Sequence, residues 1–341
     1  MALTTDALVR VHDVPRPRAA PTASVATASV ATATVPARAT TAPTRNRRLG
    51  VVAIVVSATA MGGAGVFGRM ATPPGAVTGD ALTLGRMLAG AVGMLVLLTA
   101  GRRLGALRRT RVTPSVVLGG VFLGLSLATY LSATVLIDLS LAVVLHYLGP
   151  VVATVLARVL LKERITGPDV VSLALAGVGM TIAAGLVGGA ARPAATDGQT
   201  LGIVLGATSG VLYGAALLCY RYRSDMPADV RSFWNFAFGA VGVGAMVVVS
   251  RPDLSGMTTT HWAWAVGFFL ICGLFALSLL VVAGKHLRAA ELSSLSYWEI
   301  VVASAFGALV FGEPVTGLAV VGAVLVTVAA AVPLVRRPAR P

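Results

Sequence analysis

Charged and aromatic residues are scarce in this chain. Charged residues make up 12% of its 341 positions and aromatic residues 6%, whereas 56% are hydrophobic and the mean hydropathy is +0.86. Soluble globular domains carry about 25% charged residues. This composition therefore excludes a soluble fold for most of the chain and predicts a polytopic membrane protein.

Residue types that carry catalysis or bind metals are also few. The chain has two cysteines and four histidines, and Cys219 and Cys272 lie in separate apolar runs without metal-ligand or disulfide spacing. No G-x-x-x-x-G-K stretch is present, so no P-loop would hydrolyse ATP. We expect no catalytic residues, no cofactor and no bound metal. A membrane-embedded transferase is the alternative, and it would need convergent His, Asp, Ser or metal-ligand sets.

Long apolar runs are abundant. Each spans roughly 18 to 22 residues, enough to cross a hydrocarbon core about 30 Å thick, and short connections leave no room for a folded soluble domain between them. We therefore expect an all-α integral membrane protein with ten transmembrane helices. The runs lie at about 50–68, 81–100, 115–134, 139–158, 169–188, 200–220, 232–250, 262–282, 290–311 and 315–335.

The first 48 residues differ in kind from the rest. They are rich in Ala, Thr, Val and Pro, and they show no helical period and no apolar block of spanning length. This pattern predicts a disordered tail. A secretory signal would need a compact apolar region followed by a cleavage site, so we expect the first long apolar run to be a retained span.

Basic residues flank the apolar runs unevenly. If the N-terminus is cytoplasmic, Arg69, Arg192 and Arg251 are the flanking basic residues that face outward, and the others face the cytoplasm. This asymmetry follows the positive-inside rule and predicts a protein of the cytoplasmic membrane with both termini inside. The formal net charge of +14 then reflects topology, and we expect no nucleic-acid partner.

The chain contains an internal repeat. The stretch "LLKERITG" from Leu160 returns as "LVFGEPVTG" from Leu309, and "GVVAIVVSATAMGGA" from Gly50 has a weaker match in "GIVLGATSGVLYGAA" from Gly202. The chain therefore divides into two five-helix halves. The matched positions include Tyr147 with Tyr297, Glu163 with Glu313, and Gly167 with Gly317.

An odd number of helices per half inverts the second half in the membrane. The loop after the fourth run is then cytoplasmic and keeps Lys162 and Arg164, whereas its outward-facing counterpart has Gly312 and Pro314. Inverted repeats are typical of secondary transporters, with a midplane site between the halves. The expected organisation is a tail at 1–48, a first repeat at 49–188, an external linker at 189–199, a second repeat at 200–335 and a cytoplasmic tail at 336–341.

These residues resemble the ten-helix drug/metabolite transporters built from two EamA-type repeats. The resemblance covers about 50–335 and is carried by the Glu with a following Thr-Gly in each half and by Arg86 in the second run. Family members typically show Glu-Pro or Thr-Pro at the start of the fourth and ninth helices, where this chain has Gly149-Pro150 and Glu299-Ile300. The resemblance implies the fold and solute transport. It does not select among the amino acids, sugars, nucleotide-linked compounds, metabolites and drugs that the family handles.

Glu299 is the first candidate for a substrate-binding or coupling residue. It lies about nine residues into the ninth run, where an unpaired charge costs about 2.5–3.5 kcal/mol on insertion scales. It must therefore be neutralised, paired or hydrated. We interpret it as a proton-coupling carboxyl or an anchor for a substrate amine, with a structural carboxyl as the alternative.

Four further residues are candidates for the same site. Tyr147 and Tyr297 are repeat mates that would stack on a substrate or hydrogen-bond to it, and His146 titrates near neutrality in its ordinary state. Arg86 would bind an anionic group or pair with an acid such as Glu299. Packing aromatics and an interfacial arginine that extends toward the headgroups are the structural alternatives.

Two features concern helix geometry. Pro150 removes a backbone hydrogen bond inside the fourth run and predicts a kink there. Small residues at a spacing of four would let another helix approach the sixth run closely, within one chain or, as the alternative, at a homodimer seam. These are Gly202, Gly206, Gly210 and Gly214.

Together these features predict a secondary transporter. Its partners would be a small-molecule substrate and the lipid bilayer, and we expect it to export a metabolite, amino acid or drug using a solute or proton gradient. A non-transporting membrane scaffold is a further alternative, and it would have no need of ionisable residues such as Glu299 and His146 within its spans.

Overall fold

The computed structural model describes residues 46–162, 167–183, 197–222, 226–287, 295–313 and 317–331. Expectations for the N-terminal tail, the external linker and the C-terminal tail concern residues almost all outside these ranges. Every regular element in the described ranges is a helix. The helices are α1 (Arg47–Gly62), α2 (Ala64–Met70), α3 (Gly79–Ala100), α4 (Leu104–Arg109), α5 (Pro114–Thr134), α6 (Leu139–His146), α7 (Gly149–Leu160), α8 (Gly167–Ala183), α9 (Asp197–Arg221), α10 (Ala228–Ser250), α11 (Thr259–Gly267), the π-helical η1 (Phe268–Phe275), α12 (Ala276–His286), α14 (Trp298–Phe311) and α15 (Gly317–Ala331).

Each of the ten apolar runs overlaps at least one of these helices. Within the described residues, seven helical stretches are long and apolar enough to cross a membrane, and Trp298–Phe311 and Val320–Ala329 are shorter apolar helices. Helix α8 has 17 residues. The expectation of a multi-pass helical membrane protein is confirmed by these stretches.

Local sequence sets several helix ends. Pro114 stands in the first turn of α5, where its missing N–H removes no helical hydrogen bond. Thr258 and His261 cap the start of α11 reciprocally, each side chain accepting a hydrogen bond from the other residue's backbone N–H. Gly312 ends α14 with a φ of 66°, a left-handed conformation that glycine adopts without steric cost.

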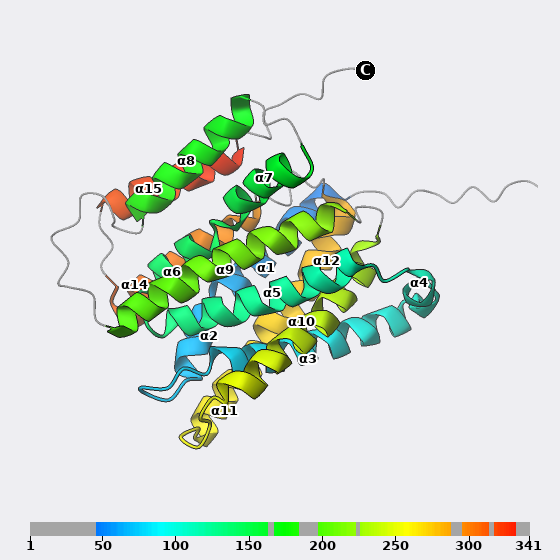
Figure 1. The fold of residues 1–341 in the computed structure, drawn as a ribbon, viewed down its shortest axis with the longest axis horizontal. Coiled ribbons are helices and arrows are strands. Elements are labelled where there is room, and N and C mark those ends of the chain that lie inside the picture. The colour runs from blue at the N-terminus through cyan, green and yellow to red at the C-terminus, as the bar shows by residue number, and fades with distance from the viewer. Residues whose placement is uncertain are drawn as a thin grey trace, which may run out of the picture. The chain divides into compact units, whose positions relative to one another are not determined.

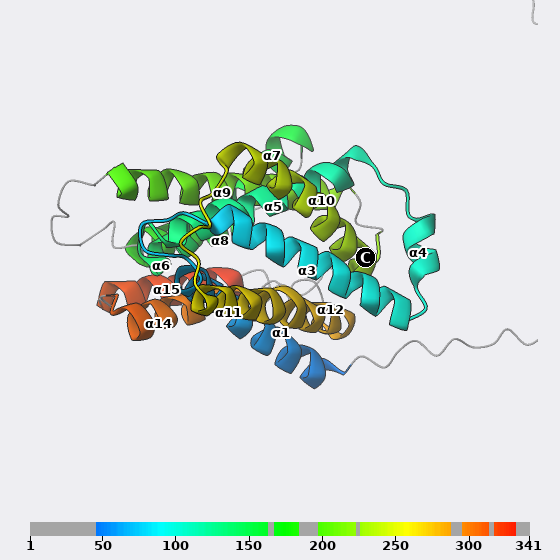
Figure 2. The ribbon, with the colours of Figure 1, turned by 90° about the horizontal axis from the view of Figure 1, so that it is seen from below.

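Helices of the two halves interleave. Helix α5 packs against α9 and α10, and α6 and α7 pack against α9. Figure 2 shows α1, α12 and α14 on one side of α3, and α5, α9 and α10 on the other. The core between these layers is therefore built from both halves at once, which places side chains from distant parts of the sequence together.

The last helix of each half stands apart from this core. Helices α8 and α15 pack on each other along their length (Figure 1). Neither contributes a described residue to the central cavity.

Two spans are interrupted at repeat-equivalent tyrosines. Helix α6 ends at His146, Tyr147 follows as its cap, and α7 begins at Gly149. Pro150 therefore lies in the first turn of a new helix, where proline is tolerated. In the second half, Tyr297 forms a turn before α14, so Glu299 lies in the first turn of that helix rather than in the interior of a continuous one.

The glycine ladder of α9 faces the segment of the same chain that runs from Leu136 through α6 into α7. A Cβ atom at Gly202 would lie 2.7 Å from Ile137, and one at Gly206 would lie 2.8 Å from Leu145. Gly210 and Gly214 likewise abut the backbone of the α6–α7 segment. In this structure the ladder allows close approach within one chain.

Substitution at the ladder is expected to destabilise the protein. A side chain in Gly210→Val would collide with the carbonyl oxygen of Leu145, which is backbone and cannot rotate away. Overpacking of this kind costs about 1–3 kcal/mol. We expect a lower thermal unfolding midpoint for the purified protein in detergent. Gly177→Val on α8 is the matched control, because no described atom lies within 4 Å of its Cβ position, and equal effects of both changes would contradict the packing argument.

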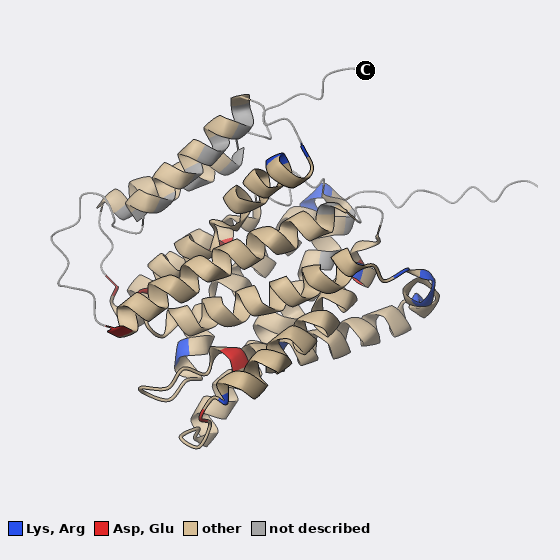
Figure 3. Cartoon of the chain, in the orientation of Figure 1, with Lys and Arg blue, Asp and Glu red and all other residues tan. Residues whose placement is uncertain are grey.

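Basic residues gather at one end of the bundle. Figure 3 shows Lys and Arg concentrated near α4 and the start of α1, whereas the middles of the helices carry few charges. At this end Arg103, the N-cap residue of α4, forms an ion pair with Asp229 in the first turn of α10. The α2–α3 and α5–α6 connections and Glu313 lie at the opposite end.

Candidate functional site

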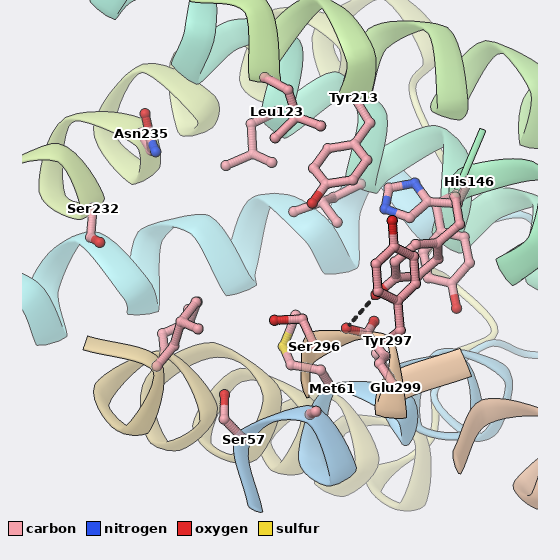
Figure 4. Close-up of a pocket in the computed structure, with 18 of the residues that line it drawn as sticks. Ser57, Met61, Leu123, His146, Tyr213, Ser232, Asn235, Ser296, Tyr297 and Glu299 are labelled. Atoms are coloured by element: carbon pink, nitrogen blue, oxygen red, sulfur yellow. Dashed lines mark hydrogen bonds between the residues drawn. The ribbon is translucent and has the colours of Figure 1, made fainter. Parts of the chain in front are cut away.

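A cavity of about 440 Å³ lies between the two halves. Figure 4 shows side chains from both halves pointing into it. It is lined by α1, α2, α3, α5, α6 and α7 of the first half and by α9, α10, α12 and α14 of the second. The polar residues that line it are Ser57, Arg86, Tyr130, His146, Tyr147, Tyr213, Tyr220, Ser232, Asn235, Ser296, Tyr297 and Glu299.

Glu299 presents its carboxylate to this cavity. The Tyr147 hydroxyl donates a hydrogen bond of 3.0 Å to Glu299 Oε2, and the ring of Tyr297 lies 5.7 Å from that of Tyr147. The carboxylate stands in the first turn of α14, where the helix dipole favours a negative charge. No ion pair to Glu299 occurs among the described residues. Its charge is compensated by the Tyr147 hydrogen bond, by the start of α14 and, without direct contact, by the positive charge of Arg86 in the same cavity.

His146 is held between two aromatic rings. Its imidazole lies 4.8 Å from Tyr130 on one side and stacks on Tyr213 at 4.8 Å with an interplanar angle of 15°. Its Nδ1 hydrogen-bonds with Ser209 Oγ at 2.6 Å, which ties α6 to α9. The side chain is 6% exposed. His146 therefore orients an aromatic wall of the cavity and also presents its ring to it.

Arg86 is buried in the bundle. It is 3% exposed, so it does not extend to an interface as a lipid-anchoring arginine would. One guanidinium nitrogen donates to Met61 Sδ at 3.0 Å, and the guanidinium carbon lies 5.3 Å from the centre of the Phe268 ring. Its Nε has no hydrogen-bond partner in the described part of the chain. Buried guanidinium N–H groups without partners are costly, so this group is suited to a ligand.

The structure brings together all five residues that the sequence singled out for binding or coupling. Several further residues line the cavity that the sequence did not mark as candidates. Tyr130 is an isolated aromatic residue in an apolar helix, without a motif to mark it. Tyr213 had a signal, because the repeat match of Gly50 with Gly202 places it opposite Met61, and both line the cavity.

A second cluster joins three connections at the end of the bundle opposite α4. Arg69, at the end of α2, forms a 3.0 Å ion pair with Glu313. Arg69 also donates hydrogen bonds to the carbonyl of Thr134, the last residue of α5, and to the carbonyl of Ile137, which lies after that helix. The Glu313 carboxylate accepts hydrogen bonds from the backbone of Leu139 and Ser140 and so caps α6. We call these contacts the Arg69–Glu313 cluster.

Backbone geometry places Glu313 in this cluster. Gly312 takes a left-handed conformation, and the Glu313 N–H then bonds back to the Gly307 carbonyl at 3.2 Å, which turns the chain toward α6. A Cβ atom at Gly307 would collide with the carboxylate, so the absence of a side chain there makes room for it. The repeat-equivalent Lys162 also has a positive φ, of 54°. Its neighbour Glu163 lies outside the described residues.

The fold and the cavity define a multi-pass membrane protein with a chamber between interleaved helical halves, lined by apolar, aromatic and a few charged side chains. Comparison with known proteins narrows the class. The EamA-like transporter family matches this chain twice, at residues 48–185 and 200–334. The chain belongs to this family and is a membrane transporter, as the resemblance in the sequence implied.

Two comparisons support this assignment. An "Uncharacterized transporter" of Archaeoglobus fulgidus is 27% identical over 285 residues, which cover 83% of this chain and 95% of the relative. A solved structure, titled only "Crystal structure of protein", has a TM-score of 0.60 and 19% sequence identity, and the match covers 84% of this chain and 96% of that one. The second likeness concerns the fold alone.

Proposed function

We propose that the protein is a secondary transporter that exports a small organic solute through the cavity between its halves. The observation that carries this proposal is the placement of the buried Arg86 and the half-buried Glu299, from different halves, in one chamber inside the bundle. Ionisable groups inside a membrane are costly and mark substrate or ion pathways. Interrupted helices at such a site, as at Tyr147 and Tyr297, recur in transporters built from inverted repeats.

The two ends of the chamber differ. Toward α4 the lining reaches Tyr220 and Ser232, near the end of α9 and the start of α10. Toward the other end, the Arg69–Glu313 cluster ties together α2, α6 and the residue that follows the C-cap of α14. In our proposal this cluster closes the outer end, and the present conformation receives solute from the cytoplasm. Relative movement of the inverted halves would then open the outer end.

Glu299 supplies the coupling in this scheme. An exchangeable proton, or a cationic group of the solute, would compensate its charge at one stage of the cycle. The Tyr147 hydroxyl, from the first half, hydrogen-bonds to this carboxylate from the second half. Gain or loss of charge at Glu299 would therefore alter a contact between the two moving parts.

Orientation is tested by cysteine labelling. In a background without Cys219 and Cys272, a cysteine at Thr260, in the exposed start of α11, should react with a membrane-impermeant maleimide added to intact cells. A cysteine at Gly105 in α4, where no described atom lies within 4 Å of the Cβ position, should react only after lysis. The opposite pattern would overturn both the orientation and the assignment of the outer end.

Transport itself is tested with purified protein in liposomes. A panel of small organic solutes, with and without a pH gradient, should include at least one that crosses faster than in protein-free liposomes. If correctly folded protein speeds the passage of none of the solutes in the panel, the proposed function is overturned. A radiolabelled solute found in this way then serves the variant experiments below.

A further inference from the structure

We propose that the solute is a zwitterion, with its anionic group bound by Arg86 and its cationic group bound by Glu299. This proposal rests on the proposed transport function and names the substrate class of the same cavity. Among the described residues that line the cavity, Arg86 and Glu299 are those that carry a formal charge, and they are opposite in sign.

The two charges do not neutralise each other by contact. The described part of the chain shows no ion pair between them, since Arg86 donates to the weak acceptor Met61 Sδ and Glu299 accepts from Tyr147. A salt bridge between them would have satisfied both groups without a ligand. Their separation instead leaves an anion-binding and a cation-binding position in one chamber.

The Arg86 position suits a carboxylate. A guanidinium presents its N–H groups as a rigid fork that matches a carboxylate with two hydrogen bonds, and the Nε of Arg86 is buried without a described partner. A ligand carboxylate would satisfy that Nε and replace the weak bond to Met61. The centre of the Phe268 ring lies 5.3 Å from the guanidinium carbon of Arg86, and this cation–π contact holds the guanidinium in place.

The Glu299 position suits an ammonium group. The carboxylate offers acceptor oxygens, and the rings of Tyr147 and Tyr297 beside it provide faces that attract a cation. Figure 4 shows Glu299, Tyr297 and Met61 around the same space. The chamber between the poles is lined by aromatic and aliphatic residues, which would accommodate an apolar side group on the solute.

Charge balance favours a zwitterion over a simple ion. A solute with one net charge would compensate one pole and leave the other, the buried Arg86 or the half-buried Glu299, without a ligand group of opposite charge. A zwitterion compensates both. Because Arg86 belongs to the first half and Glu299 to the second, such a solute would also bridge the two moving parts.

The test uses matched derivatives that differ in charge alone. The probes are L-phenylalanine and L-leucine as zwitterions, their N-acetyl forms as anions, their amides as cations and their N-acetyl amides as neutral controls. Binding is measured as thermal stabilisation of the full-length protein in detergent, and transport is measured in liposomes. We expect the wild-type protein to bind and move the free amino acids in preference to the other three forms.

The variants assign each pole. Arg86→Gln should weaken binding of the free amino acids at least about tenfold, because a hydrogen-bonded charge is lost, and should leave the amides bound as well as before. Arg86→Lys should retain part of the affinity. Glu299→Gln should weaken binding of the free amino acids and leave binding of the N-acetyl acids unchanged. Arg109→Gln, on the exposed face of α4, is the control and should match wild type.

The outcomes separate this proposal from transport in general. A wild-type protein that binds the cationic or the neutral forms as well as it binds the zwitterions would overturn the zwitterion assignment. An Arg86→Gln protein with unchanged selectivity would overturn it too. Transport of other solutes in the wider panel, with none of these probes bound, would also overturn it and leave the transport function standing. A folded protein that moves no solute of any kind would overturn both.

Discussion

Glu299→Gln is expected to abolish gradient-driven transport. The change removes the negative charge and the titrating proton but keeps the shape, and a glutamine oxygen still accepts the hydrogen bond from Tyr147. Loss of a coupling group should reduce pH-gradient-driven uptake to the protein-free background, whereas thermal unfolding and expression should stay near wild type. Glu299→Asp should retain part of the activity, because it keeps a carboxyl at a shorter reach.

The measurement is solute flux in liposomes over a pH range of about 5.5 to 8.5, which covers carboxyl titration in varied surroundings. Wild-type flux should vary with pH, and any residual flux of Glu299→Gln should not. Asp253→Asn is the control for loss of a negative charge. Hydrogen bonds from the Ser255 side chain and backbone lower the pKa of Asp253, so this loop carboxylate stays charged throughout the range. Unchanged coupled transport in Glu299→Gln would reduce Glu299 to a structural residue.

Glu313→Gln is expected to open the outer end of the cavity. The change breaks the ion pair with Arg69 and weakens the cap on α6. Removing one partner of a fully buried pair costs about 3–5 kcal/mol. Because the Arg69 side chain is 18% exposed, we expect the closed conformation to lose a smaller free energy, of at least about 1.4 kcal/mol. That energy changes a ratio of two conformations about tenfold.

The readout is the reaction of a cysteine at Ala64, which lines the cavity, with an impermeant maleimide added from outside. In the background without Cys219 and Cys272, Glu313→Gln should raise the rate at least about tenfold. Arg69→Gln should act similarly, and the double variant should add little, because both changes remove one interaction. Additive effects of the two changes, or an unaltered rate, would show that the cluster does not hold the outer end closed.

Much of the architecture was readable from one-dimensional patterns. Run length and hydropathy identified the helical membrane class, which the fold confirms, and the "KE" and "GE" steps with their Thr-Gly pairs pointed to the EamA-like family, which the family match confirms. The inverted arrangement of the halves, the count of ten spans and the orientation remain predictions. Glu299 and Arg86 stood out because a charge within an apolar run is costly and therefore conspicuous.

Helix interruptions were harder to predict. Pro150 marked the break in the fourth run, and it lies in the first turn of α7 because proline lacks the N–H that a helix interior needs. The turn at Tyr297 has no proline, so only the match with Tyr147 hinted at it. Arg69 looked like a flanking charge, and Glu313 looked like a position shared by the two repeats because it matches Glu163. Neither showed in sequence that it would contact the other.

The sequence by itself determined the membrane class, the repeat, the family and the few ionisable residues that any mechanism must use, because hydropathy, charge and repetition are properties of the chain in order. The tertiary structure decided which of those residues meet. Tyr147 reaches Glu299 and Arg69 reaches Glu313 across more than 150 positions, and Arg86 keeps an unpartnered Nε in the described structure. These contacts depend on how the helices of the two halves interleave, and that packing is set by close approaches such as Gly210 on Leu145, which no periodicity encodes.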